Sequence, residues 1–326
     1  MKNRVIWLYV IVTTVLILAI LWSLLSGSIS ITFWEIATQL FSSGNENVAI
    51  IRDLRLPRII LALFAGAALS VSGLLLQAVL KNPLADAGVI GISAGAQLFV
   101  LSLLTFSPQM YNWSPVAAFI GGSIACVLVF LFSIRSGLNP LYLIIIGVAV
   151  NAVFTGLGDL VSGIGAQVSS QASGSAIGFG MKKWSDVSML VGYGGLGLLL
   201  SFFLAKRSNL LALTDDVLVG LGAPIARIRI MIAAVAVLLA AIATAVVGVI
   251  AFVGLLVPHM ARSLLKTADH RILLPFSMLL GGLLLIIADT LGRIMFEQVE
   301  IPAAIIMLII GGPFLILLMW RNKVIR

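Results

Sequence analysis

The sequence predicts an all-α, polytopic membrane protein with about ten transmembrane helices, and its composition and its long apolar runs are the observations that predict this. Of the 326 residues, 61% are hydrophobic and 10% are charged, whereas soluble domains average roughly 45–50% apolar and about 25% charged residues. The mean hydropathy of +1.19 agrees with this assignment. A soluble globular domain and a disordered chain are therefore excluded, and the single cysteine, Cys126, excludes a disulfide scaffold.

The predicted spans are ten apolar runs separated by short breaks that hold most of the charges. A membrane-spanning helix takes about 20 apolar residues. The runs lack the two-residue alternation of β-barrel strands, and helices are the other structure that satisfies its backbone groups in lipid. The ten runs cover residues 5–25, 59–80, 88–106, 115–134, 141–161, 189–205, 230–252, 254–265, 273–291 and 302–320.

Two of these runs need an interpretation of their own. The first follows Lys2 and Arg4, as the hydrophobic core of a secretory signal does. It is long enough to span, however, and it ends in Ser26-Gly27-Ser28 without a clear cleavage pattern, so we interpret it as a first span that stays in the protein. The eighth run, 254–265, is short, which predicts a half-span or a helix buried between others.

The basic residues predict the orientation. Cytoplasmic loops of membrane proteins carry an excess of Lys and Arg, which explains the net charge of +8 better than nucleic-acid binding does. With ten spans and a cytoplasmic N-terminus, thirteen of the 20 basic residues lie inside. Both termini are therefore predicted to be cytoplasmic, and seven basic residues remain outside: Arg52, Arg55, Arg58, Lys182, Lys183, Arg262 and Arg293.

The sequence lacks the motifs of nucleotide and metal chemistry. No G-x-x-x-x-G-K-[S/T] motif occurs, so no phosphate-binding P-loop is expected. There is no H-E-x-x-H or C-x-x-C motif, and His259 and His270 are the only histidines, so no metal site is expected. A transport or channel protein is therefore favoured over an enzyme within the membrane.

Two carboxylates fall within apolar runs, where a charge costs about 2.5–3.5 kcal/mol on insertion scales. Asp289 lies four residues before Arg293 on one helix face and can pair with it. Asp159 lies among glycines, so a position at a helix end in water is expected. A proton-relay role is the alternative for either carboxylate. His259, which follows Pro258, is expected near the outer surface, and its role is left open.

Several segments, in order along the chain, resemble the FecCD-type permeases, the membrane subunits of ABC importers for iron-siderophores, haem and vitamin B12. The resemblance covers nearly the whole chain. It rests on Arg55-Leu56-Pro57-Arg58, Gly66 to Gly73, Gln77, Asn82-Pro83-Leu84-Ala85, Gly91 to Ala96, Gly248 to Arg262, Asp269-His270-Arg271, Ala288-Asp289 with Arg293, Glu300-Ile301-Pro302 and Gly311-Gly312-Pro313-Phe314.

The resemblance implies a type II ABC importer permease in a bacterial plasma membrane, formed as one domain over residues 1–326. Two copies of the chain would form a homodimer with the pathway on the dimer axis, beside the fifth span. Two cytoplasmic ATPase subunits would bind ATP and Mg, so this chain itself would be neither an enzyme nor a cofactor-binding protein. An extracytoplasmic binding protein, a lipoprotein in a Gram-positive organism, would deliver the cargo.

The resemblance also implies roles for particular residues. Arg55, Arg58 and Arg293 match positions that meet glutamates of the binding protein; the alternatives are helix-end arginines that reach to the interface and, for Arg293, the pair with Asp289. Asn82 and Leu84 match a cytoplasmic gate, with a simple helix stop as the alternative.

The segment 214–224 matches the coupling loop that seats in the ATPase, with an ordinary solvated loop as the alternative. Thr214 can cap its short helix, acidic residues favour a helix N-terminus and a glycine ends it. The residues assigned to this loop are Asp215, Asp216, Gly220, Leu221 and Gly222.

The expected cargo is an iron complex. The residues at 51–58 and 283–313 look slightly closer to haem permeases of Gram-positive bacteria, so haem is favoured over a ferric siderophore. A cobalamin importer is the alternative within the family. The alternative of another class is a proton-coupled secondary transporter that uses Asp159 or Asp289.

Overall fold

The computed structural model describes residues 2–26, 51–133, 140–168, 179, 182–296 and 299–323. Each of the ten predicted runs coincides with a helix of these residues. Within these residues, seven helices are long and apolar enough to cross a membrane, and three shorter apolar helices accompany them. The prediction of an all-α polytopic protein is therefore confirmed.

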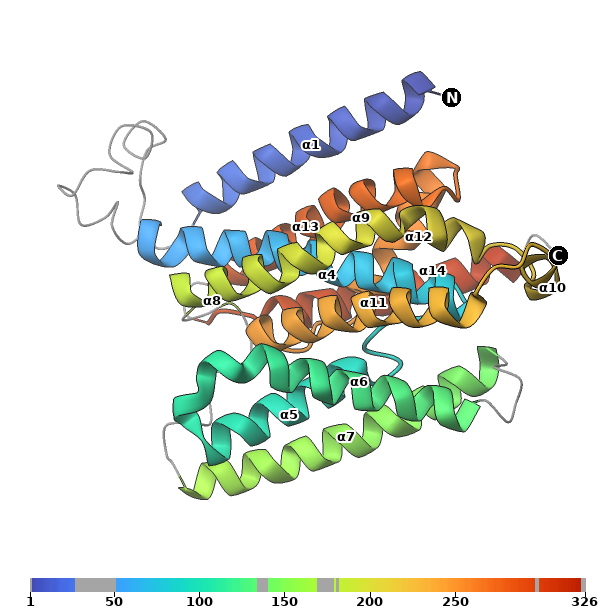
Figure 1. Ribbon diagram of the computed structural model, residues 1–326. Helices are drawn as coiled ribbons and strands as arrows, with labels where there is room; N and C mark the ends of the chain where they lie inside the picture. Colours follow the sequence, from blue (N-terminus) through green and yellow to red (C-terminus); the bar gives the residue numbers. More distant parts are fainter. Residues whose placement is uncertain are drawn as a thin grey trace.

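The helices lie side by side in one bundle (Figure 1). Short π or 3-10 turns precede or interrupt some of them, as at η1 (Ile51–Arg55), η2 (Pro108–Trp113) and η4 (Leu190–Gly194). The α-helices are α1 (Lys2–Leu25), α4 (Leu56–Leu80), α5 (Ile92–Phe106), α6 (Ser114–Ser133), α7 (Pro140–Val168), α8 (Trp184–Met189), α9 (Gly195–Leu210), α10 (Asp215–Gly220), α11 (Ile225–Val247), α12 (Val253–Leu265), α13 (His270–Ile294) and α14 (Ala303–Lys323).

Helix α4 is the centre of the bundle, because it is buried along most of its length and packs on α11, α12 and α13. Glycines allow its backbone to approach two of these helices closely. Gly66 faces Gly281 of α13, and Gly73 faces Gly254 of α12; a Cβ at any of these positions would clash with backbone or side-chain atoms. Small residues at such crossings are typical of helix packing in membranes.

Helices α5, α6 and α7 form a second group beside α11 (Figure 1). Gly95 of α5 and Gly121 of α6 allow a close crossing of the same kind. Helix α11 contacts both α5 and α6 and so joins the two groups. On the other side, α1 packs along α13, where the Tyr9 hydroxyl donates to the carbonyl of Ile272 at 2.6 Å.

Helix α12 is the predicted half-span. It begins where Gly254 meets Gly73, inside the bundle, after a segment in which Gly248 and Phe252 both have positive φ. It ends near the N-terminus of the chain, since Arg4 donates to the carbonyl of Leu264 at 3.1 Å. The helix therefore covers only the half of the bundle that is nearer the N-terminus.

This position corrects two predictions from the sequence. Arg262 and His259, expected at the outer side, lie in the half of the bundle that holds the N-terminus, and Arg262 donates to Gln77 near the end of α4. His259 packs edge-to-face on Phe314 of α14. Arg262 lies in the last turn of α12, at the end of the helix nearer the N-terminus, and the prediction had assigned it to the other end. With Arg262 moved, the count predicted from the sequence for the side of the N-terminus rises to fourteen of the 20 basic residues.

Helix α7 corrects a third prediction. It continues to Val168, so Asp159 lies within the helix on an exposed face, and not at a helix end. The glycines around Asp159 do not break the helix. The described chain ends and α10 lie at the same end of the bundle (Figure 1).

Candidate functional site

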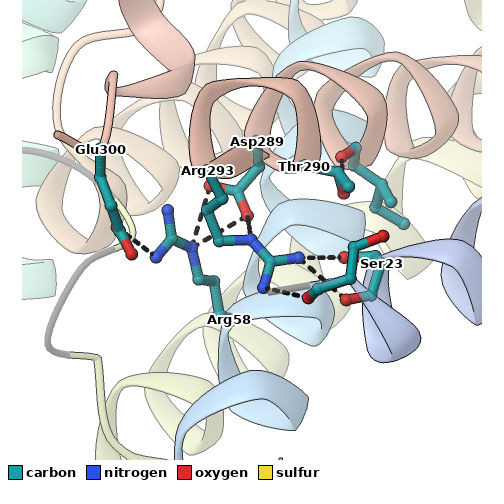
Figure 2. Close-up of polar contacts among 8 residues, drawn as sticks. Ser23, Arg58, Asp289, Thr290, Arg293 and Glu300 are labelled. Atoms are coloured by element: carbon teal, nitrogen blue, oxygen red, sulfur yellow. Dashed lines mark hydrogen bonds and ion pairs between the residues drawn. The ribbon is translucent and has the colours of Figure 1, made fainter. Parts of the chain in front are cut away.

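At the end of the bundle opposite the termini, Arg58 of α4 forms a buried ion pair with Asp289 of α13 (Figure 2). Its Nε lies 3.0 and 2.9 Å from the two carboxylate oxygens. Its Nη1 donates at 2.7 Å to Glu300, in the segment before α14. The side chains of Arg58 and Asp289 are 10% and 2% exposed, whereas that of Glu300 is 59% exposed. Two charges far apart in the sequence therefore compensate each other inside an apolar bundle.

Arg293 and Arg55 hold the end of α1 at the same place. Arg293 Nη2 donates to the carbonyl oxygen and to Oγ of Ser23, at 2.9 and 2.7 Å, and its Nε lies 3.7 Å from Asp289 (Figure 2). Arg55 Nη1 donates to the carbonyl of Leu24 at 2.9 Å. The last carbonyls of a helix lack intrahelical partners and carry partial negative charge, so arginines stabilise them.

The three arginines expected to dock a partner thus gather at one end of the bundle, and each has partners within the chain. The expected pair of Asp289 with Arg293 is present, but Asp289 binds Arg58 more closely. Neither this second pair nor the contact of Glu300 with Arg58 was predicted from the sequence. A usable signal was available, because an arginine and an aspartate that both fall at apolar helix positions need partners.

At the other end, Asp215 joins three segments. It accepts from Lys81 Nζ at 2.9 Å and from Arg229 Nη2 at 3.0 Å. Lys81 also donates to the carbonyl of Leu213 at 2.6 Å. Lys81, which hydrogen-bonds the carboxylate, and Arg229 hold the pKa of Asp215 below its ordinary value. Asp215, at the start of α10, is therefore tied to the end of α4 and to the first turn of α11.

Helix α10 presents an apolar tip to its surroundings. Leu218 is fully buried, but Val219 and Leu221 are 68% and 66% exposed. Gly222 ends the helix with φ +66. Thr214 occupies the N-cap position, but its side chain makes no capping hydrogen bond, which corrects that part of the prediction. Exposed apolar residues at a helix end beside charged groups favour a partner protein at this surface.

The segment after α4 forms a tight turn. Asn82 is buried, and its Oδ1 accepts from the backbone N–H of Leu84 at 2.9 Å. Leu84 is half-buried. This geometry is that of a helix stop, the alternative predicted from the sequence, and the gate role of Asn82 and Leu84 stays a prediction.

Gln77 connects this turn to α12 and was not singled out for any role from the sequence. Its Nε2 donates to the carbonyl oxygens of Gly254 and Ala85, at 3.2 and 3.4 Å, and its Oε1 accepts from Arg262. The buried Asp86 lies against Gly254. The side chain of Gln77, on α4, thus connects α4 with α12 and with the turn that follows α4.

The described residues include no group of three or more His, Cys, Asp or Glu side chains that could hold a metal ion. His270 Nδ1 lies 2.8 Å from Oδ1 of Asn209, a contact that helps to fix the start of α13. His259 contacts Phe314, as described above.

Comparison with known proteins gives a consistent result. A model of the FecCD transport family matches residues 15–321. The protein named "Probable heme-iron transport system permease protein IsdF" from Staphylococcus aureus (strain MSSA476) is 38% identical over 322 residues, which cover 99% of this chain and 98% of the relative. The same protein from Staphylococcus aureus (strain Newman) has the same identity and coverage.

Solved structures agree in fold. The structure described as "An inward-facing conformation of a putative metal-chelate type ABC transporter" has a TM-score of 0.78 and 27% identity, over 98% of this chain and 99% of that one. PsaBC from Streptococcus pneumoniae, in complex with Fab, has a TM-score of 0.58 and 14% identity, over 88% and 95% of the two chains, and supports the fold alone.

Proposed function

The chain belongs to the FecCD transport family and is a multi-pass membrane permease, and from this premise we propose that it is the membrane subunit of an ATP-driven importer with haem as its cargo. The observation that carries the proposal is the full-length similarity to the staphylococcal haem-iron permease. The fold shared with a metal-chelate transporter supports the broader class of cargo.

The proposed assembly contains two copies of this chain and two separate ATPase subunits. The chain has no P-loop, so a separate pair of cytoplasmic ATPase subunits would bind ATP and Mg. Two copies of the chain, each a single domain over residues 1–326, would enclose the path beside α7. The excess of basic residues on the side of the termini supports a cytoplasmic position for both of them.

The segment 214–224 is the proposed contact with the ATPase. The exposed apolar residues of α10 suit a cleft in a partner protein, and Asp215 provides a path from this contact into the membrane helices. Lys81, the ion-pair partner of Asp215, directly precedes Asn82 and lies three residues before Leu84. Asn82 and Leu84 are the residues proposed to form the gate. A displacement of α10 would therefore pull directly on the turn that holds these residues.

Replacing Asp215 with Asn is expected to lower ATP-driven uptake about fivefold, the lower end of typical coupling between sites, while ATP hydrolysis continues. The amide cannot form the ion pairs with Lys81 and Arg229, so motion of α10 reaches the gate less well. Uptake and ATP hydrolysis would be measured together in proteoliposomes. Asp216→Asn is the matched control, because the described residues supply Asp216 with no ion pair. Equal uptake by wild type and Asp215→Asn would contradict this path.

The binding protein is proposed to dock at the opposite end, where Arg55, Arg58 and Arg293 gather. Complementary charges at such a rim steer encounter and fix register, and the arginine fork suits carboxylates. Each arginine is largely occupied within the chain, so docking would exchange an internal partner for one on the binding protein. Glu300 is the most exposed of the internal partners and the first that would be displaced.

The experiment that tests the function is ATP hydrolysis by the reconstituted complex with its binding protein, loaded in turn with haem, a ferric siderophore and cobalamin. Haem-loaded protein is expected to stimulate hydrolysis, and haem-free protein is the control. Arg55→Glu should weaken that stimulation through charge repulsion. Stimulation by cobalamin or the siderophore alone would overturn the haem assignment. Uptake driven by a proton gradient without any ATPase would overturn the importer itself.

A further inference from the structure

A groove runs between α6 and α11 on the outside of the bundle, with a volume of about 530 Å³. Its floor includes Cys126 of α6 and Val237 of α11, which are buried. Its rim includes Val127, Leu131 and Ile230, which are 62%, 57% and 68% exposed. In a membrane, such a groove opens toward lipid.

The groove has the length of one bilayer leaflet. Along α11 it extends from Ala226 to Val237, which is about 16 Å at a rise of 1.5 Å per residue. The hydrocarbon core of a bilayer is about 30 Å thick, so one leaflet contributes about 15 Å. An acyl chain that lies along α11 would therefore fill the groove from the interface to the middle of the membrane.

One basic side chain lies at the end of this apolar groove. Arg229, in the first turns of α11, lines the groove at the end of the bundle that holds the termini. Its Nη2 binds Asp215, but its buried Nε has no hydrogen-bond partner within the described residues. A buried N–H without a partner costs free energy, so an acceptor at this place would stabilise the arginine. Phosphate oxygens are acceptors that suit the guanidinium group.

We propose that the groove binds an anionic phospholipid of the leaflet on the side of the termini, with an acyl chain between α6 and α11 and the phosphate at Arg229. The assignment of that leaflet to the cytoplasmic side rests on the orientation proposed above. The lipid site itself depends neither on the cargo nor on the ATPase. The exposed Arg227, two residues earlier, does not line the groove and so provides a matched control for Arg229.

The test uses the full chain in nanodiscs that hold equal amounts of phosphatidylglycerol and phosphatidylcholine, followed by release in the mass spectrometer with lipids retained. Wild type is expected to retain phosphatidylglycerol over phosphatidylcholine on the order of fivefold, the preference that one arginine near the surface supplies. Arg229→Gln should remove the preference, whereas the matched control Arg227→Gln should keep it.

A second variant keeps the result independent of Arg229, which also binds the coupling segment. Ala234→Phe places a ring in the groove from an exposed position and should lower retention of both lipids. Thr14→Phe, at an exposed position on α1, should retain lipid as wild type does.

Equal retention of both lipids by wild type would overturn the site, and so would undiminished retention of phosphatidylglycerol by the Ala234→Phe variant. Loss of dimers in the Ala234→Phe variant would also overturn it, because it would assign the groove to a second copy of the chain. None of these depends on ATP hydrolysis, so failure of the lipid site is distinguishable from failure of the transport assignment.

Discussion

Replacing Asp289 with Ala is expected to lower the free energy of unfolding by about 3–5 kcal/mol, the cost of leaving a buried charge without its partner. The carboxylate is 2% exposed and accepts both hydrogen bonds of the Arg58 Nε contact. Without this carboxylate, and among the partners that the described residues supply, Arg58 keeps Glu300, and Arg293 keeps its contacts to the end of α1. Unfolding in detergent with increasing dodecyl sulfate, followed by circular dichroism, measures this change.

Two controls separate loss of the buried pair from loss of any charge in the cluster. Glu300→Gln removes a carboxylate that is 59% exposed and should cost less than about 1 kcal/mol, as exposed ion pairs do. Arg58→Met combined with Asp289→Leu should recover much of the stability, because replacing both partners by apolar residues is often nearly neutral. A single Asp289→Ala variant as stable as wild type would refute the structural role of the pair.

Replacing Gly281 with Ala is expected to lower the free energy of unfolding by about 3 kcal/mol, the upper part of the range for overpacked cores. The new Cβ would clash with the carbonyl oxygen of Gly66 and with Ser70. Neither is the movable end of a long side chain, so α4 and α13 would have to move apart at the centre of the bundle. The same unfolding experiment measures the effect.

Gly195→Ala is the matched control, because a Cβ at Gly195 of α9 would meet no atom of the described residues within 4 Å apart from its own helix backbone. Alanine favours a helix over glycine by about 1 kcal/mol, so this variant should be as stable as wild type or more so. If Gly281→Ala and Gly195→Ala behaved alike, the close approach of α4 and α13 would be wrong.

Much of the fold is predictable because the signal for a membrane helix is local. Every apolar run became a helix, and the short run 254–265 became the half-length α12. The prediction that a helix ends near Asp159 was wrong, because the glycines around it resemble a helix stop but are common within membrane helices. The side of Arg262 was wrong, because hydropathy does not say where in the bundle the short helix α12 begins and ends.

The candidate site was predictable in part. The residues at the two ends of the bundle could be named from the sequence, since they match family segments. Their partners could not, because Arg58 and Asp289 are 231 residues apart, and Lys81 and Asp215 are 134 apart. Gln77 showed no signal that would distinguish its bridging role from that of any other polar residue near a helix end.

The sequence by itself thus determined the class of protein, its helices and its family. The reason is that a helix in lipid needs a long apolar run, and each such run can be recognised in the sequence without knowledge of the others. Only the tertiary structure decided which charges compensate one another and where an apolar groove meets an arginine. The physical reason is that a charge inside an apolar bundle must find its partner through space. Which helices lie within reach is set by close crossings such as that of Gly66 with Gly281.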